Sequence, residues 1–463
     1  MKNFELQPTY ENVLDSFEKD ILNRNIDILG FADLLNSIDS SCSIALDARW
    51  GAGKTFFIKQ VKLVLDAFNE HIENPHSDDN ERVKRAWHTI KEANKPELQP
   101  QVSVYYDAWI NDNDEDPILS LVYSILQSVS TDFTFTQRPG FWDIAAAITE
   151  AITGHSAIAI REAIQSVNPL EQIRSVKSLQ EQIAEFLESL LAERGNRIVV
   201  FVDELDRCNP AFAIKLLERI KHYFSNSRIT FVFSVNIAEL QHVVRNHYGS
   251  GFNASRYLDR FFDLRIDLPP ANTSLFYQDI GLENGSWVYE TVCKAVIDRY
   301  QFTLREIAKF YRMARAAAYI PTHHSKAYDF CFSEEKSIRF CLMFLVPIMI
   351  GLKICDYSRY EAFVTGKDGS PLFEVLANLE NNISILNDLL SDKETFCDAG
   401  QAQQGKVVKL EDKLNAVYIE LFVRRQEAYS QGAHIGQLTF RASTKETLLR
   451  AVSTLSKYAD FEV

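Results

Sequence analysis

The residues of this chain best suited to chemistry lie between positions 41 and 59, in the segment SCSIALDARWGAGKTFFIK. A short apolar run leads into a turn with Gly51 and Gly53, then Lys54 and Thr55, and then apolar residues at helical spacing. Strand, glycine-containing turn, Lys-Thr and helix is the order of a phosphate-binding loop. The glycines suit such a loop because its backbone N–H groups can face phosphate oxygens with no Cβ in the way.

The start of the following helix supplies the rest of a nucleotide site. Its first N–H groups and the positive end of its dipole would face the phosphates. The Lys54 ammonium would reach the β- and γ-phosphates, and the Thr55 hydroxyl is a hard oxygen ligand for Mg²⁺. The consensus loop has a glycine where this chain has Ala48, which is also small. We therefore predict that Mg²⁺ and ATP bind here, the nucleotide contacting Ala48, Arg49, Trp50, Gly51, Ala52, Gly53, Lys54, Thr55 and Phe56.

A second group of candidate residues follows the run RIVVFV at residues 197–202. The run is apolar on both faces, as in a buried parallel strand, and Asp203 and Glu204 stand at its carboxyl end, where open α/β sheets bind ligands. Asp203 would hold Mg²⁺, directly or through water. Glu204 would orient and deprotonate the water that attacks the γ-phosphate, with Lys54 as the other catalytic group. An aspartate that only caps the next turn is the alternative interpretation.

Phosphoryl transfer also requires positive charge against the γ-phosphate. Arg207, Arg256 and Arg260 are the catalytic candidates, and surface salt bridges would explain each of them as well. Ser234 and Asn236 stand at the end of a further apolar run, ITFVFSV. Either could sense the γ-phosphate, and an ordinary strand-end hydrogen bond is the alternative.

The apolar runs also predict the elements that position these residues. QVSVYY at 101–106 supplies a strand between the two motifs, which is typical of P-loop NTPases with an additional strand and a catalytic Glu. We predict an α/β parallel sheet of this type in residues 1–270, with helical insertions near 70–100 and 130–195. Residues 271–463 show helical periodicity and are predicted to form an α-helical C-terminal domain.

Upstream of the first strand, residues 10–38 are patterned as two helices. The polar pair Asn23-Arg24 forms an elbow between them. It could contact the base or ribose of a nucleotide, or it could be a plain loop, and the sequence leaves both interpretations open.

Two apolar segments raise the question of a membrane span. Residues 141–164 are rich in Ala and Ile but carry charged side chains at intervals, which favours an amphipathic or packed helix pair. The 13-residue apolar run Phe340–Leu352 is broken by Pro347 and Gly351 and is too short for a bilayer, so we predict a core helix. Membrane contact is therefore disfavoured.

The composition narrows the class of protein. The 463 residues carry a net charge of −14, which argues against a generally basic surface that coats nucleic acid. The seven cysteines form no CxxC pair. Reduced thiols in a cytoplasmic protein are expected, rather than a disulfide framework or a zinc site. The segment MKNFELQPTYENV has no apolar core of a secretion signal, which fits that expectation.

Four ordered motifs give the chain a resemblance to the KAP family of P-loop NTPases. They are WGAGKT at 50–55, DAW at 107–109, VVFVDELDRC at 199–208 and RYLDRFFDL at 256–264. The family typically shows a WGxGKT loop, an (N/D)AW element after the second strand, a DDLDR-like acidic box and a YLxK(I/F) segment. Here Glu204 stands where a second Asp is common and Arg260 where a Lys is common. Neither change damages the chemistry, and the resemblance covers about residues 10–320.

The resemblance implies an ATPase that uses Mg²⁺. It also implies a nucleotide-sensing role for Arg305, because LRE at 304–306 is similar to the start of a family helix beyond the sheet. Many members carry transmembrane helices between the two nucleotide motifs, and this chain looks like a soluble member or one with a membrane-peripheral insert. Bacterial members are similar to ATPases of mobile elements and anti-phage defence, so the resemblance implies that context.

Three functions remain as hypotheses. The first is a switch in which ATP binding and slow hydrolysis move the sheet domain against the C-terminal domain and control a partner effector protein, with a homo-oligomer as a further expectation. The second is a motor or remodeller stimulated by nucleic acid, which the acidic balance disfavours. The third is a scaffold that binds nucleotide without turnover, which the intact Lys54, Thr55, Asp203 and Glu204 disfavour. ATP is favoured over GTP because no NKxD-like motif is apparent.

Overall fold

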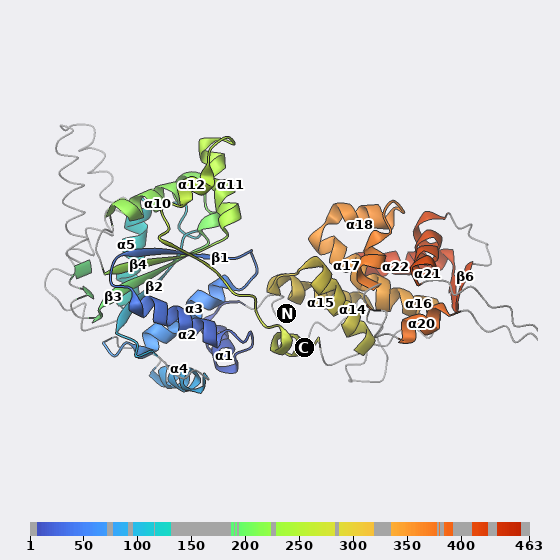
Figure 1. Ribbon diagram of the computed structural model, residues 1–463, viewed down its shortest axis with the longest axis horizontal. Coiled ribbons are helices and arrows are strands. Elements are labelled where there is room, and N and C mark those ends of the chain that lie inside the picture. Colours follow the sequence, from blue (N-terminus) through green and yellow to red (C-terminus); the bar gives the residue numbers. More distant parts are fainter. Residues whose placement is uncertain are drawn as a thin grey trace, which may run out of the picture. The chain divides into compact units, whose positions relative to one another are not determined.

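The computed structural model divides the chain into two compact units, which are described separately (Figure 1). Gln7–Thr273 forms the N-terminal unit, and Ser274–Val463 forms the body of the C-terminal unit. The structure describes residues 7–71, 77–90, 96–114, 116–130, 187–188, 190–191, 194–223, 228–282, 287–318, 335–376, 379, 384–391, 410–424 and 433–454. The apolar segment 141–164 lies outside these ranges, as does most of the predicted insertion near 130–195.

A five-stranded parallel sheet lies at the centre of the N-terminal unit (Figure 1). Its order is β2-β3-β4-β1-β5, with β1 Cys42–Asp47, β2 Gln101–Asp107, β3 Arg197–Asp203, β4 Ile229–Val235 and β5 Leu264–Asp267. The predicted α/β fold of the P-loop type is confirmed. One detail of the prediction was wrong: β4, not the QVSVYY strand, lies in space between β1 and β3. The reason is that β2 pairs with the outer side of β3.

Helices cover both faces of this sheet (Figure 1). One face packs against α1 Tyr10–Lys19, α2 Asn25–Ser37, α3 Lys54–Phe68 and α4 Ser77–Thr89, and the other against α5 Pro117–Ser130, α10 Pro210–Tyr223, α11 Ile237–Tyr248 and α12 Ala254–Leu258. Strand β3 serves both cores, since Val200 and Val202 face one and Val199 and Phe201 face the other. This alternation explains why the run RIVVFV is apolar throughout.

The predicted excursion near 70–100 is more than a surface feature. Its helix α4 buries Val83 and Trp87, and the Trp87 ring lies 5.6 Å from the ring of Phe68 in α3, centroid to centroid. The excursion therefore extends the core under the phosphate-loop helix.

The C-terminal unit is mostly helical, with one short hairpin that the sequence analysis did not predict. Its helices are α13 Ser274–Asp279, α14 Trp287–Tyr300, α15 Leu304–Ala318, α16 Lys336–Phe340, α17 Val346–Cys355, α18 Tyr357–Val364, α19 Ser370–Leu376, α20 Ser384–Leu390, α21 Leu410–Tyr418 and α22 Ala442–Thr454. The hairpin pairs β6 Ala433–Ile435 with β7 Leu438–Phe440 in antiparallel fashion. One hydrophobic core joins these elements.

The apolar run Phe340–Leu352 is not broken at Pro347 or Gly351, contrary to expectation. It belongs to a continuous helix, Lys336–Cys355, of 20 residues. A π-helical turn, Cys341–Leu345, precedes Pro347, and Pro347 then falls in the first turn of α17, where a missing N–H is tolerated. By length and composition this helix could cross a membrane, but 72% of its apolar window is buried inside the protein, as in a core helix.

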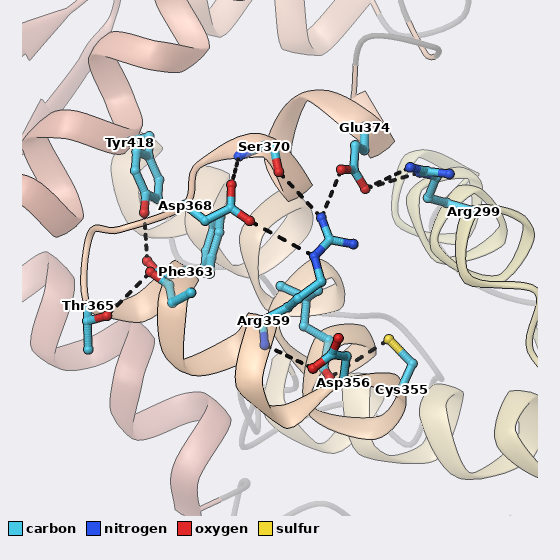
Figure 2. A network of polar contacts seen from close by, with 12 residues as sticks. Arg299, Cys355, Asp356, Arg359, Phe363, Thr365, Asp368, Ser370, Glu374 and Tyr418 are labelled. Atoms are coloured by element: carbon cyan, nitrogen blue, oxygen red, sulfur yellow. Dashed lines mark hydrogen bonds and ion pairs between the residues drawn. The ribbon is translucent and has the colours of Figure 1, made fainter.

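A polar network fastens three helices of this unit to one another (Figure 2). The Glu374 carboxylate of α19 accepts from Arg359 of α18 at 2.8 Å and pairs with Arg299 of α14 at 3.0 Å. Asp368 accepts the Ser370 N–H at 2.9 Å and lies 4.0 Å from Arg359 Nε. The network fixes the loop between α18 and α19 against α14.

Two helical glycines should respond to alanine in opposite directions. A Cβ on Gly351 in α17 would lie 2.5 Å from Cγ1 of buried Val296, whereas a Cβ on Gly30 in α2 would have no atom within 4 Å. Ala is favoured over Gly in a helix interior by about 1 kcal/mol. We expect Gly30→Ala to raise the thermal unfolding midpoint. Gly351→Ala should lower it, because overpacking costs about 1–3 kcal/mol. Differential scanning calorimetry of both variants checks this, and a stabilised Gly351→Ala would contradict the packing described here.

Candidate active site

The phosphate loop lies between β1 and α3 and has the backbone that its glycines allow. The Ala52 N–H donates to the Arg49 carbonyl at 3.3 Å, which closes a turn over Trp50 and Gly51. Gly51 has φ 79° and Gly53, at the N-terminus of α3, has φ 90°. Both values lie in the left-handed region that favours glycine. The turn leads directly into the first free N–H groups of α3, which is the arrangement that binds phosphates.

Lys54 is buried at the start of α3, with 8% of its surface exposed. Its ammonium donates to the carbonyl oxygen of Ala48 at 2.6 Å and to that of Arg49 at 3.3 Å. Burial lowers the pKa of Lys54, while the charges of Asp206 and Asp203 act in the opposite direction. The amine thus lies inside the loop, among carboxylates that favour its charged form.

The two predicted metal ligands are in contact. Thr55 Oγ1 donates to Asp203 Oδ2 at 2.7 Å, and the Tyr105 hydroxyl donates to the same oxygen at 3.1 Å. Within the described ranges, no group of three His, Cys, Asp or Glu side chains could enclose a metal ion. One hydroxyl and one carboxylate nevertheless fit Mg²⁺, because that ion is held largely by substrate phosphates and water. The donor set therefore fits a nucleotide-bound Mg²⁺ and not a protein-caged ion.

Glu204 follows Asp203 with an unusual backbone and a restrained side chain. Its φ is 61°, in the left-handed region that non-glycine residues rarely adopt. The carboxylate forms an ion pair with Arg207, although Oε2 is not aligned for a hydrogen bond. Burial raises the pKa of Glu204 to about 7, against the opposing influence of Arg207. A base with this pKa suits proton transfer near neutral pH.

Arg207 has a second contact. Its guanidinium carbon lies 5.5 Å from the centroid of the Trp109 ring, and half of the Trp109 surface is exposed. Of the three candidate arginines, Arg207 is therefore placed beside the acidic pair. Arg256 and Arg260 are exposed, and neither guanidinium forms a hydrogen bond or an ion pair with the part of the chain that the structure describes.

The structure places the other predicted nucleotide contacts as follows. The Asn236 side chain caps α11 by accepting the Glu239 N–H at 3.5 Å. Buried Ser234 lies opposite Asp203 in the strand register, and its Oγ has no hydrogen-bond partner. Phe56 packs partly buried against the core below the loop. Arg305 belongs to the C-terminal unit, where it is exposed in the first turn of α15. Its sensing role stays a prediction.

Three residues around the loop make contacts that the sequence analysis did not predict. Arg24, thought to be a base contact or a plain loop, is buried and donates to the carbonyls of Ala52 at 3.0 Å and Pro269 at 2.7 Å. Tyr105 and Asp206 likewise bond to residues of the site. Asp206 lies within the motif at 199–208 and Tyr105 just before DAW, but neither position indicates a partner, because each bond joins segments far apart in the chain.

Three comparisons show what this chain is similar to. A model of the KAP family P-loop domain matches residues 25–311, which is more than half of the chain. An uncharacterized protein of Methanocaldococcus jannaschii is 42% identical over 52 residues, which cover 11% of this chain and 26% of that protein. A structure of the Aeropyrum pernix ORC2 protein, solved as ADPNP-ADP complexes, has 13% identity and a TM-score of 0.27, with 66% of this chain and 62% of that chain covered. The chain thus spans about a quarter of the curated relative.

The ionisation of Glu204 should control the pH dependence of any ATP turnover. A general base acts in its ionised form, so kcat/KM for ATP at saturating Mg²⁺ should rise with pH and level off above an apparent pKa of about 7. Arg207→Gln removes a cation that favours the ionised form, and should move the rise to higher pH. The nucleotide itself titrates in the same way with the wild type and with Arg207→Gln. The difference between the two pH profiles therefore reports the pKa of Glu204. Identical profiles would mean that another group limits the reaction.

Proposed function

Because the chain belongs to the KAP family of P-loop NTPases, we propose that it hydrolyses ATP and that this cycle switches a partner effector protein. The observation that supports turnover is that the phosphate loop, the Thr55–Asp203 pair and Glu204 meet at one edge of the sheet. In the proposed reaction a water oxygen attacks the γ-phosphorus and the bond to the bridging oxygen breaks. The Glu204 carboxylate accepts the proton of the water, which leaves ADP and phosphate.

The other residues would act by charge and position. The loop N–H groups and Lys54 would bind the β- and γ-phosphates and stabilise the charge that develops on them. Thr55 and Asp203 would hold Mg²⁺, which when bound would neutralise phosphate charge. The Ser234 hydroxyl, buried beside Asp203 with no partner, would be the group of β4 available to the γ-phosphate or its water.

The Glu204–Arg207 ion pair supports a switch rather than a constantly active ATPase. The pair engages the carboxylate that the reaction requires. A triphosphate carries more charge than one carboxylate and would compete for Arg207. A protein that contacts the half-exposed Trp109 beneath the guanidinium would disturb the same pair. Slow hydrolysis that accelerates when the pair opens is the behaviour that a switch requires.

We propose a cytoplasmic setting and, following the resemblance to bacterial family members, a role in anti-phage defence through a protein effector. The guanidinium groups of Arg256 and Arg260, which are exposed and have no partner among the described residues, would be available to complete the site of a second copy. Nucleic acid is not favoured as a partner, given the net charge of −14.

Substitution of Glu204 and Arg207 tests the catalytic assignment. Glu204→Gln should lower ATP turnover by about 10²–10⁴-fold, because the amide cannot accept the proton. It should leave ATP binding in place. The pKa of Glu204 is higher in the folded protein than its ordinary value, so its ionised form is disfavoured by folding. Glu204→Gln should therefore not lower the unfolding midpoint at pH 8, which controls for misfolding. Arg207→Gln should raise basal turnover at high pH, on the plateau where Glu204 is ionised in both proteins, and a fall of the plateau would instead assign Arg207 to phosphate stabilisation.

The same assay separates the alternatives when it is run with and without DNA. Turnover that rises with DNA would support a nucleic-acid motor. ATP binding without hydrolysis, both with and without DNA, would support a nucleotide-binding scaffold. The mass of Glu204→Gln in solution, measured with ATP and with ADP, tests assembly, and we expect oligomers that depend on ATP. In the otherwise unchanged protein, Arg256→Ala or Arg260→Ala should lower turnover, because the arginine that completes the neighbouring site is then missing.

A further inference from the structure

One buried carboxylate behind the acidic pair joins three elements of the site. Asp206, which is 5% exposed, lies in the short turn after β3. Its Oδ2 accepts the Trp50 indole Nε1–H at 2.6 Å and the Asn236 backbone N–H at 3.1 Å. The first donor belongs to the phosphate loop and the second follows β4. The turn after β3 is thus connected to both neighbouring segments through a single oxygen.

The bond to Trp50 is of the strong kind. A hydrogen bond to an ionised carboxylate is shorter than one between neutral groups and about twice as strong. Trp50 is a residue with 44% of its surface exposed, yet its one polar atom is directed at a buried acid. This contact places the indole, whereas hydrophobic burial alone would not.

The turn that carries Trp50 has few other attachments. Its Arg49–Ala52 hydrogen bond is internal, at 3.3 Å, and its carbonyls accept from Lys54 at Arg49, at 3.3 Å, and from Arg24 at Ala52, at 3.0 Å. Just before the turn, the Ala48 N–H donates to the Val235 carbonyl of β4 at 3.2 Å. Gly51 at the centre of the turn contributes no side chain. Of these contacts, the Asp206 bond is the one that joins the Trp50 side chain to the turn after β3 and, through the same oxygen, to the residue after β4.

We propose that Asp206 is a positioning residue of the phosphate loop, because its carboxylate ties the Trp50 turn to the ends of β3 and β4 and so holds the loop N–H groups where the triphosphate binds. This inference rests on the proposed ATP site, but it concerns nucleotide affinity rather than the chemical step. Asp206 touches neither the phosphates nor the attacking water in this scheme.

The test combines a structural signal with affinity. In protein labelled with ¹⁵N at tryptophan, the Trp50 indole resonance is identified as the one missing in Trp50→Phe. Asp206→Ala should move that resonance to the position of a water-exposed indole. The affinity for a fluorescent ATP analogue, and 1/KM for ATP, should fall about tenfold or more, with kcat changed less than about threefold. Trp50→Phe should weaken binding of the analogue in the same way. This position is half-exposed, so the change should not impair folding.

The conservative variant distinguishes position from charge. In Asp206→Asn the amide oxygen can take the position of Oδ2 and accept hydrogen bonds from Trp50 Nε1–H and the Asn236 N–H. The indole resonance and the affinity for the analogue should therefore match those of the wild type. The double variant Asp206→Ala/Trp50→Phe should bind no more weakly than Asp206→Ala alone. Any of three results would overturn the proposal. The indole resonance could stay in place in Asp206→Ala, Asp206→Asn could bind the analogue as weakly as Asp206→Ala, or Trp50→Phe could bind it with unchanged affinity. A wild type that binds the analogue but never hydrolyses ATP would instead refute the proposed turnover alone.

Discussion

The crowding of carboxylates at the carboxyl end of the parallel sheet is the constraint on which the site depends. The acidic side chains there are Asp47, Asp107, Asp203, Glu204 and Asp206. Burial raises the pKa values of Asp107, Glu204 and Asp206, so their charged forms must be compensated. Among the described residues they are compensated by N–H and O–H donors from neighbouring segments and by cations that include Lys54, Arg207 and Arg265, the last paired with Asp47 at 2.6 Å.

The negative charge of this edge gives the proposed cycle a physical basis. A triphosphate adds several negative charges to an edge that is already acidic, so it must draw on loop N–H groups, Lys54 and a metal ion. It also competes with Glu204 for Arg207, which is the pairing that restrains the proposed base. Binding of the substrate and release of the base then share one electrostatic cause, without a separate mechanical linkage.

The C-terminal unit is stabilised mainly by hydrophobic packing. A single hydrophobic core surrounds the helix Lys336–Cys355, and a charged network that includes Arg359 and Glu374 joins α18 to α19 (Figure 2). Close approach of α17 to α14 requires Gly351. A unit with its own core can respond as one body, which a switch that acts on an effector would require.

The sequence by itself determined the local parts: the phosphate loop, the strands apolar on both faces, and the acidic pair at the end of β3. These parts are encoded by short patterns, since glycine conformation and two-residue periodicity act between near neighbours. It also indicated the KAP family, which the match over residues 25–311 bears out. The tertiary structure alone decided that β4 separates β1 from β3, that Arg24 and Asp206 hold the loop, and that Arg207 restrains Glu204. Strand order and the contacts of Arg24 and Asp206 depend on segments far apart in the chain. The Arg207 pairing is local, but which neighbouring acid it takes follows from the left-handed turn at Glu204, and no sequence pattern specifies that conformation.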